Sequence, residues 1–143
     1  MLTVINQIKD YITSLPEPKR SDMVILHENI LRVFPKDSML WFLDGKDARG
    51  KIVTNPNIGY GYLKIHYANG ATKDFYQTGI SANSTGISVY IMGLEDKKFL
   101  VETYKDTLGK ATITGYCIKF KKLQDIDLEV LKKAILEGIK QTS

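Results

Sequence analysis

Apolar and polar residues alternate with a period of two in the middle of the chain. From Gly59 to Tyr67, Gly, Leu, Ile and Tyr occupy the odd positions, whereas Tyr, Lys and His occupy the even positions. The same alternation returns from Ile87 to Met92. Because successive side chains of a strand point to opposite faces, both stretches predict strands with one apolar and one polar face. We therefore expect three consecutive strands between Ile58 and Met92.

The connections between these strands favour an antiparallel sheet. Residues 68–70 (Ala-Asn-Gly) predict a short turn, and residues 81–86 are rich in Ser, Asn, Thr and Gly. Two chemically different faces are typical of an antiparallel sheet that helices cover on its apolar side only. Gly59 and Gly61 open a strand rather than a helix, so we expect them to allow bending or close backbone approach rather than to bind phosphate.

Helical spacing of apolar residues appears on both sides of this central region. Thr3 is the expected N-cap of the first helix, Ser21 or Asp22 that of the second, and Asp127 lies at the start of the last. Pro35 ends the second helix. The four predicted helices cover residues 3–14, residues 21–34, residues 96–108 and a C-terminal segment from about residue 127.

Three further strands complete the predicted sheet. Residues 39–43 form a short apolar run, which we expect to be an edge strand paired with residues 51–54, with Trp41 in the core. Residues 113–121 alternate, with Tyr116, Ile118 and Phe120 on the apolar side, and we expect that side to join the core. The prediction is one α+β domain over residues 1–143: an antiparallel sheet of about five to six strands with N-terminal helices, one middle helix and a C-terminal helix packed on one face.

Composition and charge are those of an ordinary globular protein. The net charge of +4 and a pI near 9.0 permit anionic partners without demanding them. Cys117 is the single cysteine, so no internal disulfide forms and a reducing compartment is the simpler expectation. The N-terminus lacks the apolar core of a signal peptide, and no stretch is apolar enough for a membrane span. We therefore expect a cytoplasmic protein without membrane contact, whose oligomeric state the pattern leaves open.

Short motifs in the expected order connect the chain with a known family. They comprise residues 14–20 (Ser-Leu-Pro-Glu-Pro-Lys-Arg), 59–61 (Gly-Tyr-Gly), 67–70 (Tyr-Ala-Asn-Gly), 79–81 (Gly-Ile-Ser), 89–92 (Val-Tyr-Ile-Met), 108–110 (Leu-Gly-Lys), Cys117 with Lys119, and 125–128 (Asp-Ile-Asp-Leu). The chain thus resembles the YdhG-like family, small bacterial domains of largely unknown function. The resemblance implies a compact α+β domain with helices flanking an antiparallel sheet. Some members are described as frataxin-like iron chaperones, so it also implies a possible role in binding iron.

The chain departs from that family pattern in two places. Residues 82–84 are Ala-Asn-Ser, where many members carry a basic turn after the Gly-x-Ser element. Residues 111–115 are Ala-Thr-Ile-Thr-Gly, where many members carry a basic run that contains histidine. If those charges bind an anion in relatives, this chain lacks most of the basic residues that would bind it.

The polar face of the predicted sheet is the first candidate site. Aromatic residues interleaved with cations bind anionic or planar ligands by stacking and charge, and they also bind single-stranded nucleic acid. A net charge of +4 is weak for nucleic acid, and a merely solvated face is the structural alternative. The candidate residues are Tyr60, Tyr62, Lys64, His66, Tyr76, Tyr90, Cys117 and Lys119.

A small acidic group is the second candidate site. Asp125, Asp127 and Glu129 offer oxygens that could bind a hard cation such as iron weakly, although helix capping explains the same residues. Cys117 beside Lys119 could be a nucleophile or a soft metal ligand, and a structural cysteine is the alternative. No catalytic set can be drawn from His27 and His66, the two histidines. We therefore expect a non-enzymatic binding protein, either an iron-binding module or a protein that binds a small anionic or aromatic ligand.

Overall fold

A computed structural model describes residues 3–143. Its elements are α1 (Val4–Ser14), α2 (Lys19–Val33), β1 (Leu40–Leu43), β2 (Asn57–Tyr60), β3 (Leu63–His66), β4 (Thr72–Phe75), β5 (Thr78–Asn83), β6 (Gly86–Ile91), α3 (Phe99–Tyr104), β7 (Thr112–Ile113), β8 (Cys117–Phe120), η1 (Leu123–Asp125) and α4 (Leu128–Thr142). The main sheet has six antiparallel strands in the order β1-β2-β5-β6-β8-β7, and β3 and β4 form a separate two-stranded hairpin. The expected α+β fold with an antiparallel sheet is confirmed.

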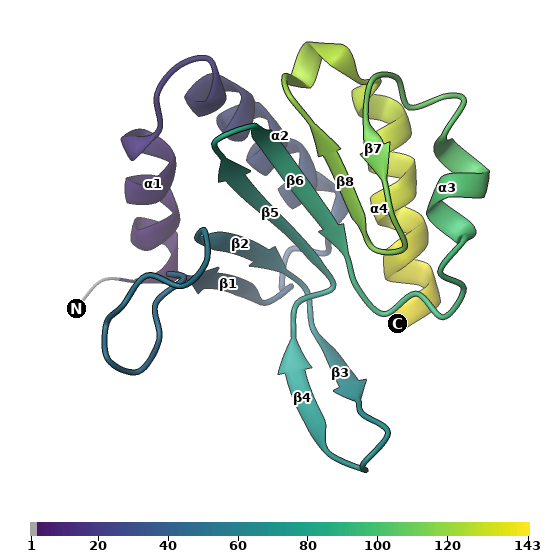
Figure 1. The fold of residues 1–143 in the computed structure, drawn as a ribbon, viewed down its shortest axis with the longest axis horizontal. Coiled ribbons are helices and arrows are strands. Elements are labelled where there is room, and N and C mark those ends of the chain that lie inside the picture. The colour runs from purple at the N-terminus through teal and green to yellow at the C-terminus, as the bar shows by residue number, and fades with distance from the viewer. Residues whose placement is uncertain (1–2) are drawn as a thin grey trace.

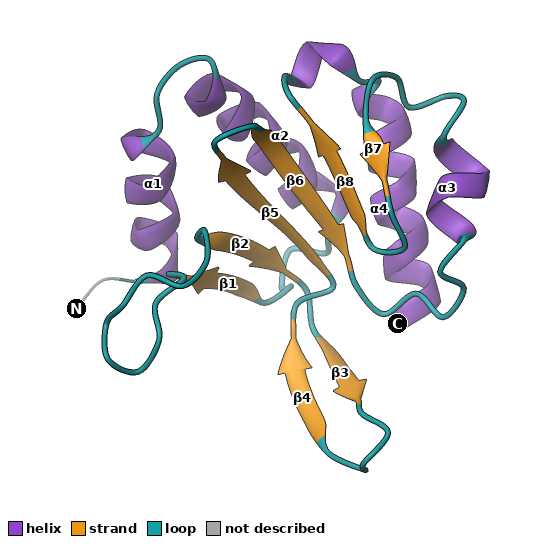
Figure 2. Ribbon diagram, viewed as in Figure 1, coloured by secondary structure: helices purple, strands orange, loops and turns teal. Residues whose placement is uncertain are grey.

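The helices pack on one side of the main sheet. In Figure 1, α2 and α4 lie behind the strands, with α1 beside α2, and no helix of the described chain covers the front of β5, β6 and β8. The colouring by secondary structure in Figure 2 shows the same division, with the β3–β4 hairpin projecting from the body. The core therefore lies between the back of the sheet and the helices.

One row of cross-strand neighbours forms the centre of that core. Ile58 pairs with Ile80, Ile80 with Val89, and Val89 with Ile118, so the row crosses β2, β5, β6 and β8. All four side chains are fully buried and contribute to the same cluster as residues of α2 and α4. Each such side chain contributes roughly 1.5–3 kcal/mol of hydrophobic free energy on burial. Residues one position along each strand must then face the front.

Gly61 breaks the first predicted strand into two elements. Its φ is +80°, a left-handed conformation that favours glycine. The chain leaves the main sheet after Tyr60 and begins the hairpin at Leu63. The prediction of a single strand from Gly59 to Tyr67 is therefore wrong, while the expectation that its glycines allow bending is confirmed.

The predicted strand over residues 113–121 is a second hairpin. β7 and β8 are joined by a tight turn in which the Thr114 amide donates to the Cys117 carbonyl oxygen at 2.8 Å. Gly115 lies within the turn. Ile118 and Phe120 of β8 enter the core as expected, whereas Tyr116 precedes the strand and is 54% exposed.

The edge strand β1 pairs with a different partner from the predicted one. Its neighbour is β2, and residues 51–54 make only an isolated bridge between Lys46 and Ile52. Ile52 is 72% exposed, so this apolar residue gains little by joining a sheet edge. Trp41 lies opposite Gly59 on the front of the sheet rather than in the core, and its indole nitrogen donates to the Gly61 carbonyl at 2.8 Å.

The helix ends follow their capping chemistry. The Thr3 hydroxyl accepts from the Asn6 amide, and Asp127 accepts from two amides of the first turn of α4, as expected. α2 begins at Lys19, earlier than predicted, with Pro18 at the cap position. α3 is shorter than predicted, because a turn through Asp96 occupies the residues before it. No helix within residues 3–143 is both long and apolar enough to cross a membrane.

Two glycines form the seat of a tyrosine ring on the front of the sheet. Gly59 and Gly79 are cross-strand partners, and a Cβ atom at either position would lie 2.4 Å from an atom of the Tyr76 ring. Phe75 stacks on the other side of that ring, with the centroids 4.0 Å apart. The Tyr76 hydroxyl donates to Asn57 at 3.0 Å. The expectation that these glycines allow close approach is confirmed for Gly59.

We expect Gly79→Ala to destabilise the protein by about 1–3 kcal/mol, because the added methyl group overlaps the Tyr76 ring. The sign is informative, since Gly→Ala without overlap stabilises by restricting the unfolded chain. Urea unfolding measures the free energy. Gly79→Ala introduced into Tyr76→Ala is the control and should cost much less than in the wild type. An equal cost in both backgrounds would show that the ring is not what excludes the side chain.

Candidate functional site

The eight candidate residues do not share one surface. One residue, in β2, lies on the helix side of the sheet, and the break at Gly61 places three others on or beside the hairpin. The remaining four lie on or against the front of the sheet. In that order, the groups are Tyr60; Tyr62, Lys64 and His66; and Tyr76, Tyr90, Cys117 and Lys119.

Tyr60 is part of the core and is not available to a ligand. It is fully buried, its ring stacks on Phe34, and its hydroxyl lies 2.6 Å from Nδ1 of His27. Burial raises the pKa of Tyr60 well above its ordinary value. Register places Tyr60 on the opposite face from Tyr90, because Tyr60 pairs with Thr78 whereas Tyr90 pairs with Gly79. The prediction that both tyrosines share a face is wrong.

Two of the three hairpin candidates are engaged with one carboxylate. The Tyr62 hydroxyl donates to Asp74 at 2.7 Å, and the Lys64 ammonium lies 3.7 Å from the same carboxylate oxygen. The hydrogen bond to Asp74 raises the pKa of Tyr62. His66 lies further along the same strand, opposite Thr72. The β3–β4 hairpin that carries Lys64 and His66 projects away from the main sheet in Figure 1.

The front of strands β6 and β8 gathers the rest of the predicted site. Tyr90 pairs with Cys117, and Ser88 pairs with Lys119, so all four side chains leave the sheet on its front. Tyr90 also stacks on Tyr116, with ring centroids 6.3 Å apart and planes inclined by 21°. We call Tyr90, Tyr116, Cys117, Ser88 and Lys119 the open face. It offers an aromatic pair at one end and a cation at the other.

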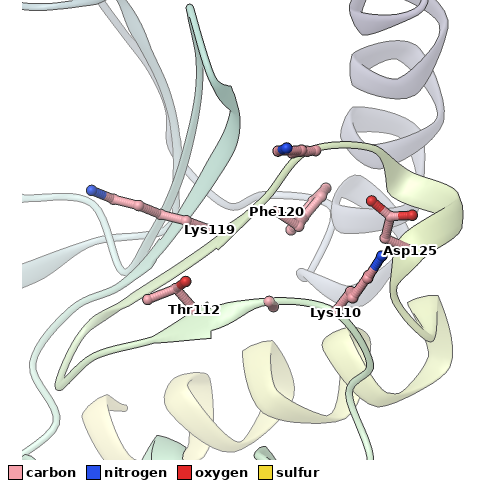
Figure 3. Close-up of a pocket in the computed structure, with 7 residues that line it drawn as sticks. Lys110, Thr112, Lys119, Phe120 and Asp125 are labelled. Carbon is pink, nitrogen blue, oxygen red and sulfur yellow. The ribbon is translucent and has the colours of Figure 1, made fainter.

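A pocket adjoins the open face at the end of β8 (Figure 3). It has a volume of about 330 Å³ and continues into a second hollow of about 220 Å³ that shares four of its residues. We call it the lysine pocket. Its lining residues are Lys110, Ala111, Thr112, Lys119, Phe120, Lys121 and Asp125.

The lysine pocket carries more positive than negative charge. Lys110, Lys119 and Lys121 line it, and Asp125 is the one carboxylate among its lining residues. None of the ion pairs formed within residues 3–143 includes any of these three lysines. A concave surface with unpaired cations raises the local concentration of anions. The pocket is therefore suited to an anionic group.

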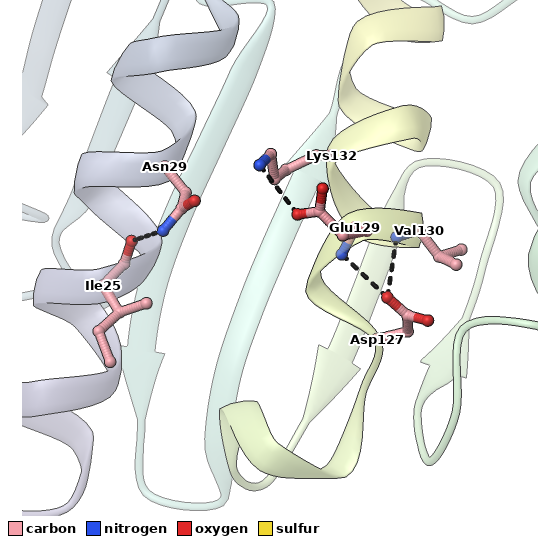
Figure 4. Close-up of polar contacts among 6 residues, drawn as sticks. All are labelled: Ile25, Asn29, Asp127, Glu129, Val130 and Lys132. Carbon is pink, nitrogen blue, oxygen red and sulfur yellow. Dashed lines mark hydrogen bonds and ion pairs between the residues drawn. The ribbon is translucent and has the colours of Figure 1, made fainter.

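The acidic residues near the start of α4 are used for structure (Figure 4). One oxygen of Asp127 accepts from the amides of Glu129 and Val130, at 3.0 and 3.3 Å. Glu129 pairs with Lys132 at 2.9 Å. Asp125 instead lies at the lysine pocket. Within residues 3–143 no group of three or more His, Cys, Asp or Glu side chains could hold a metal ion, so these three carboxylates do not fit an iron site.

Cys117 lacks the surroundings of a nucleophile. Its side chain is 4% exposed, and burial raises the pKa of the thiol despite the nearby charge of Lys119. A reactive cysteine needs the reverse, a lowered pKa and an accessible sulfur. The structural interpretation of Cys117 is therefore the one that its environment supports.

The sequence analysis did not identify several residues of the open face and of the lysine pocket. Tyr116 was assigned to the apolar side of a strand, but the turn at Gly115 places it outside the strand and against Tyr90. Lys110 and Thr112 come from the other arm of the same hairpin. The signal available in the sequence was Gly115, because an isolated glycine within a strand pattern indicates a local irregularity of the strand.

No family model matches this chain, and neither does any curated protein or solved structure. The resemblance to the YdhG-like family stays a prediction. What the protein binds is inferred below from its own side chains.

We expect the Cys117 thiol to react with a disulfide reagent such as DTNB at least about a hundredfold more slowly in the native protein than in urea. Burial and the raised pKa both reduce the thiolate that is available. Absorbance of the released thiolate measures the rate. A native rate close to that of the unfolded chain would show that the sulfur is accessible.

We expect the free energy of unfolding to fall as the pH is lowered from about 7.5 to about 5, in part because of His27. Burial lowers the pKa of His27 in the folded state, so the unfolded chain takes up the proton first. Stability from this group is complete above the unfolded pKa of about 6.5 and is lost below it. Urea unfolding across this range should show a smaller loss for His27→Gln than for the wild type. Identical slopes would contradict the assignment.

Proposed function

We propose that the protein is a non-enzymatic binding protein for a small ligand that carries both a planar aromatic group and an anionic group. The observation that supports this proposal is the stacked pair of Tyr90 and Tyr116 beside a pocket with three unpaired lysines. Tyrosine rings bind a planar group by stacking, and lysine side chains bind the anion.

The spacing along β8 defines the size of the ligand. Lys119 and Lys121 follow Cys117 by two and four residues, and a strand rises roughly 3.3 Å per residue. The Cα atoms of Lys119 and Lys121 therefore lie about 7 and about 13 Å along the chain from that of Cys117, which pairs with Tyr90. Those lengths suit a nucleoside phosphate or an extended aromatic carboxylate. A free aromatic compound or a free inorganic anion would use one end of the site only.

Other roles receive less support from the side chains. An iron-chaperone role, implied by the resemblance, would need a different donor set from Asp125, Asp127 and Glu129 as they are arranged. A polymeric nucleic acid would gain from a continuous basic groove, whereas the three lysines here surround one pocket. A cytoplasmic location is part of the proposal, because the single cysteine needs no oxidising compartment.

Titration followed by amide NMR tests the proposal with three probes: adenosine 5′-monophosphate, adenosine and inorganic phosphate. We expect the nucleotide to shift the amide resonances of Tyr90, Tyr116, Lys119 and Lys121 at lower concentration than either fragment. Tyr116→Ala should weaken nucleotide binding by about threefold to tenfold, the value of one aromatic contact. The double variant Lys119→Gln, Lys121→Gln should weaken it while leaving adenosine binding unchanged.

Lys105→Gln is the matched control, because it removes an exposed lysine that lies at the end of α3 and does not line the pocket. It should bind the nucleotide as the wild type does. Equal weakening by Lys105→Gln and by the double variant would reduce the effect to net charge. Absence of shifts on the open face with the nucleotide and with a panel of aromatic carboxylates would overturn the proposal.

A further inference from the structure

A groove between α1 and α2 is lined mainly by aliphatic side chains. The two helices pack against one another, as Figure 1 shows, and the groove has a volume of about 360 Å³. No residue that lines it also lines the lysine pocket, so the two sites are separate. Its aliphatic lining residues are Ile5, Ile8, Ile12 and Val24.

The floor of the groove belongs to the core, whereas its rim is open to water. Ile8 and Ile12 are buried and are members of the core cluster. Ile5 is 68% exposed and Val24 is 39% exposed. A molecule that fills the groove would therefore remove apolar surface of both helices from water, which favours binding.

His27 adds one directed hydrogen-bond donor to this apolar lining. Its Nδ1 atom lies 2.6 Å from the Tyr60 hydroxyl, which is fully buried and bonds to no other group within residues 3–143. The hydroxyl must donate to Nδ1, because its proton would otherwise be buried without an acceptor. Burial lowers the pKa of His27, so the ring is neutral at pH 7 and carries its single proton on Nε2.

The Nε2–H group is what His27 offers to the groove. The ring is half-buried and lines the groove, while its Nδ1 atom is turned toward Tyr60 of β2. No group of the described residues accepts a hydrogen bond from Nε2. A half-buried donor without an acceptor favours a ligand that supplies one.

The charges around the groove favour an uncharged ligand. Lys9 and Glu28 line it, one of each sign, and neither forms an ion pair within residues 3–143. An ion would lose hydration among the aliphatic side chains and would meet no net charge of the opposite sign.

The size of the groove favours a small molecule over a protein. Its volume falls within the range of small-molecule sites, roughly 300–1,000 Å³. Eight residues line it, whereas a specific protein–protein interface uses roughly 20–30 residues on each side. A partner protein or a second copy of the chain would therefore leave most of such an interface outside the groove.

We propose that the groove between α1 and α2 binds an uncharged, mainly apolar small molecule whose carbonyl group accepts a hydrogen bond from Nε2 of His27. The aliphatic side chains provide affinity for the body of the ligand, and the imidazole fixes its orientation. A ketone or an ester of about this size meets both requirements. The site is independent of the one proposed for an aromatic anion on the front of the sheet.

The experiment titrates the full chain with four compounds and follows the amide resonances of Ile8, Ile12 and Val24 by NMR. The compounds are the ketone 4-phenylbutan-2-one, butylbenzene, 4-phenylbutanoate and 4-phenylbutylammonium. We expect the ketone to bind in the groove more tightly than either ion. Butylbenzene has no acceptor and reports on the aliphatic lining alone.

The double variant His27→Phe, Tyr60→Phe tests the hydrogen bond. It removes both partners of the buried pair, so no polar group of that pair is left unsatisfied in the core. The ketone should bind the double variant at least about fivefold more weakly than the wild type, whereas butylbenzene should bind both equally.

Val24→Gln tests the aliphatic wall, and Leu31→Gln is its matched control. The two residues lie on α2 with nearly equal exposure, 39% and 40%, but only Val24 lines the groove. Val24→Gln should weaken the binding of the ketone and of butylbenzene at least about threefold. Leu31→Gln should leave both affinities as they are in the wild type.

A further measurement needs no substitution: long-range ¹⁵N–¹H correlations of the His27 ring should show the proton on Nε2. A proton on Nδ1 would overturn the proposal, as would equal ketone affinity for the wild type and the double variant. Tighter binding of either ion than of the ketone would also overturn it. A dimer that dissociates when the ketone is added, read from sedimentation equilibrium, would identify a second copy as the occupant instead.

Discussion

A single backbone conformation, the positive φ of Gly61, determines where much of this chain goes. A side chain at Gly61 would be strained by the φ of +80° and would also meet the Gln77 side chain at 2.3 Å. Gln77 is buried there and donates to Thr142 at the end of α4 at 2.8 Å. The bend thus separates a hairpin from the main sheet and leaves a cleft between the two. Strand β2 can end with Tyr60 in the core, while the next strand starts in a new direction.

The fold class could be predicted from the sequence, because period-two alternation in β6 and β8 and helical spacing in α1, α2 and α4 come from residues that bury one face each. The location of the candidate site could be predicted only in part. The bend at Gly61 puts Leu63 and Ile65 in a separate hairpin, so their alternation does not report the face of Tyr60. Alternation alone does not reveal a bend between two stretches that both alternate. Tyr60 was assigned to the wrong face for that reason. Tyr90, Cys117 and Lys119 lie in two adjacent strands of the main sheet with no bend between them, and the alternation placed them on the same face correctly.

The partner of β1 could not be predicted for a different reason. Residues 51–54 contain Ile52 and Val53 and satisfy the local pattern of a strand, yet both side chains are exposed. The actual partner, β2, gives β1 a place beside the buried row through Ile58. For β1, burial against a distant strand outweighs the local β propensity of residues 51–54. The positions of Tyr116 and Lys110 likewise depend on the pairing of β7 with β8 across the turn at residues 114–116, which the alternation did not predict.

The projecting hairpin also has a consequence for how the molecule opens. It has two strands of four residues each, bonded to one another and outside the main sheet. A two-stranded ribbon is only marginally stable by itself. The strands that carry Ile80 and Val89, by contrast, pack against the helices in the core. Amide protons of β3 and β4 should therefore exchange with solvent through local fraying, whereas those of β5 and β6 should exchange only when the whole protein unfolds. The chain thus combines a rigid body with an arm that can melt and reform independently.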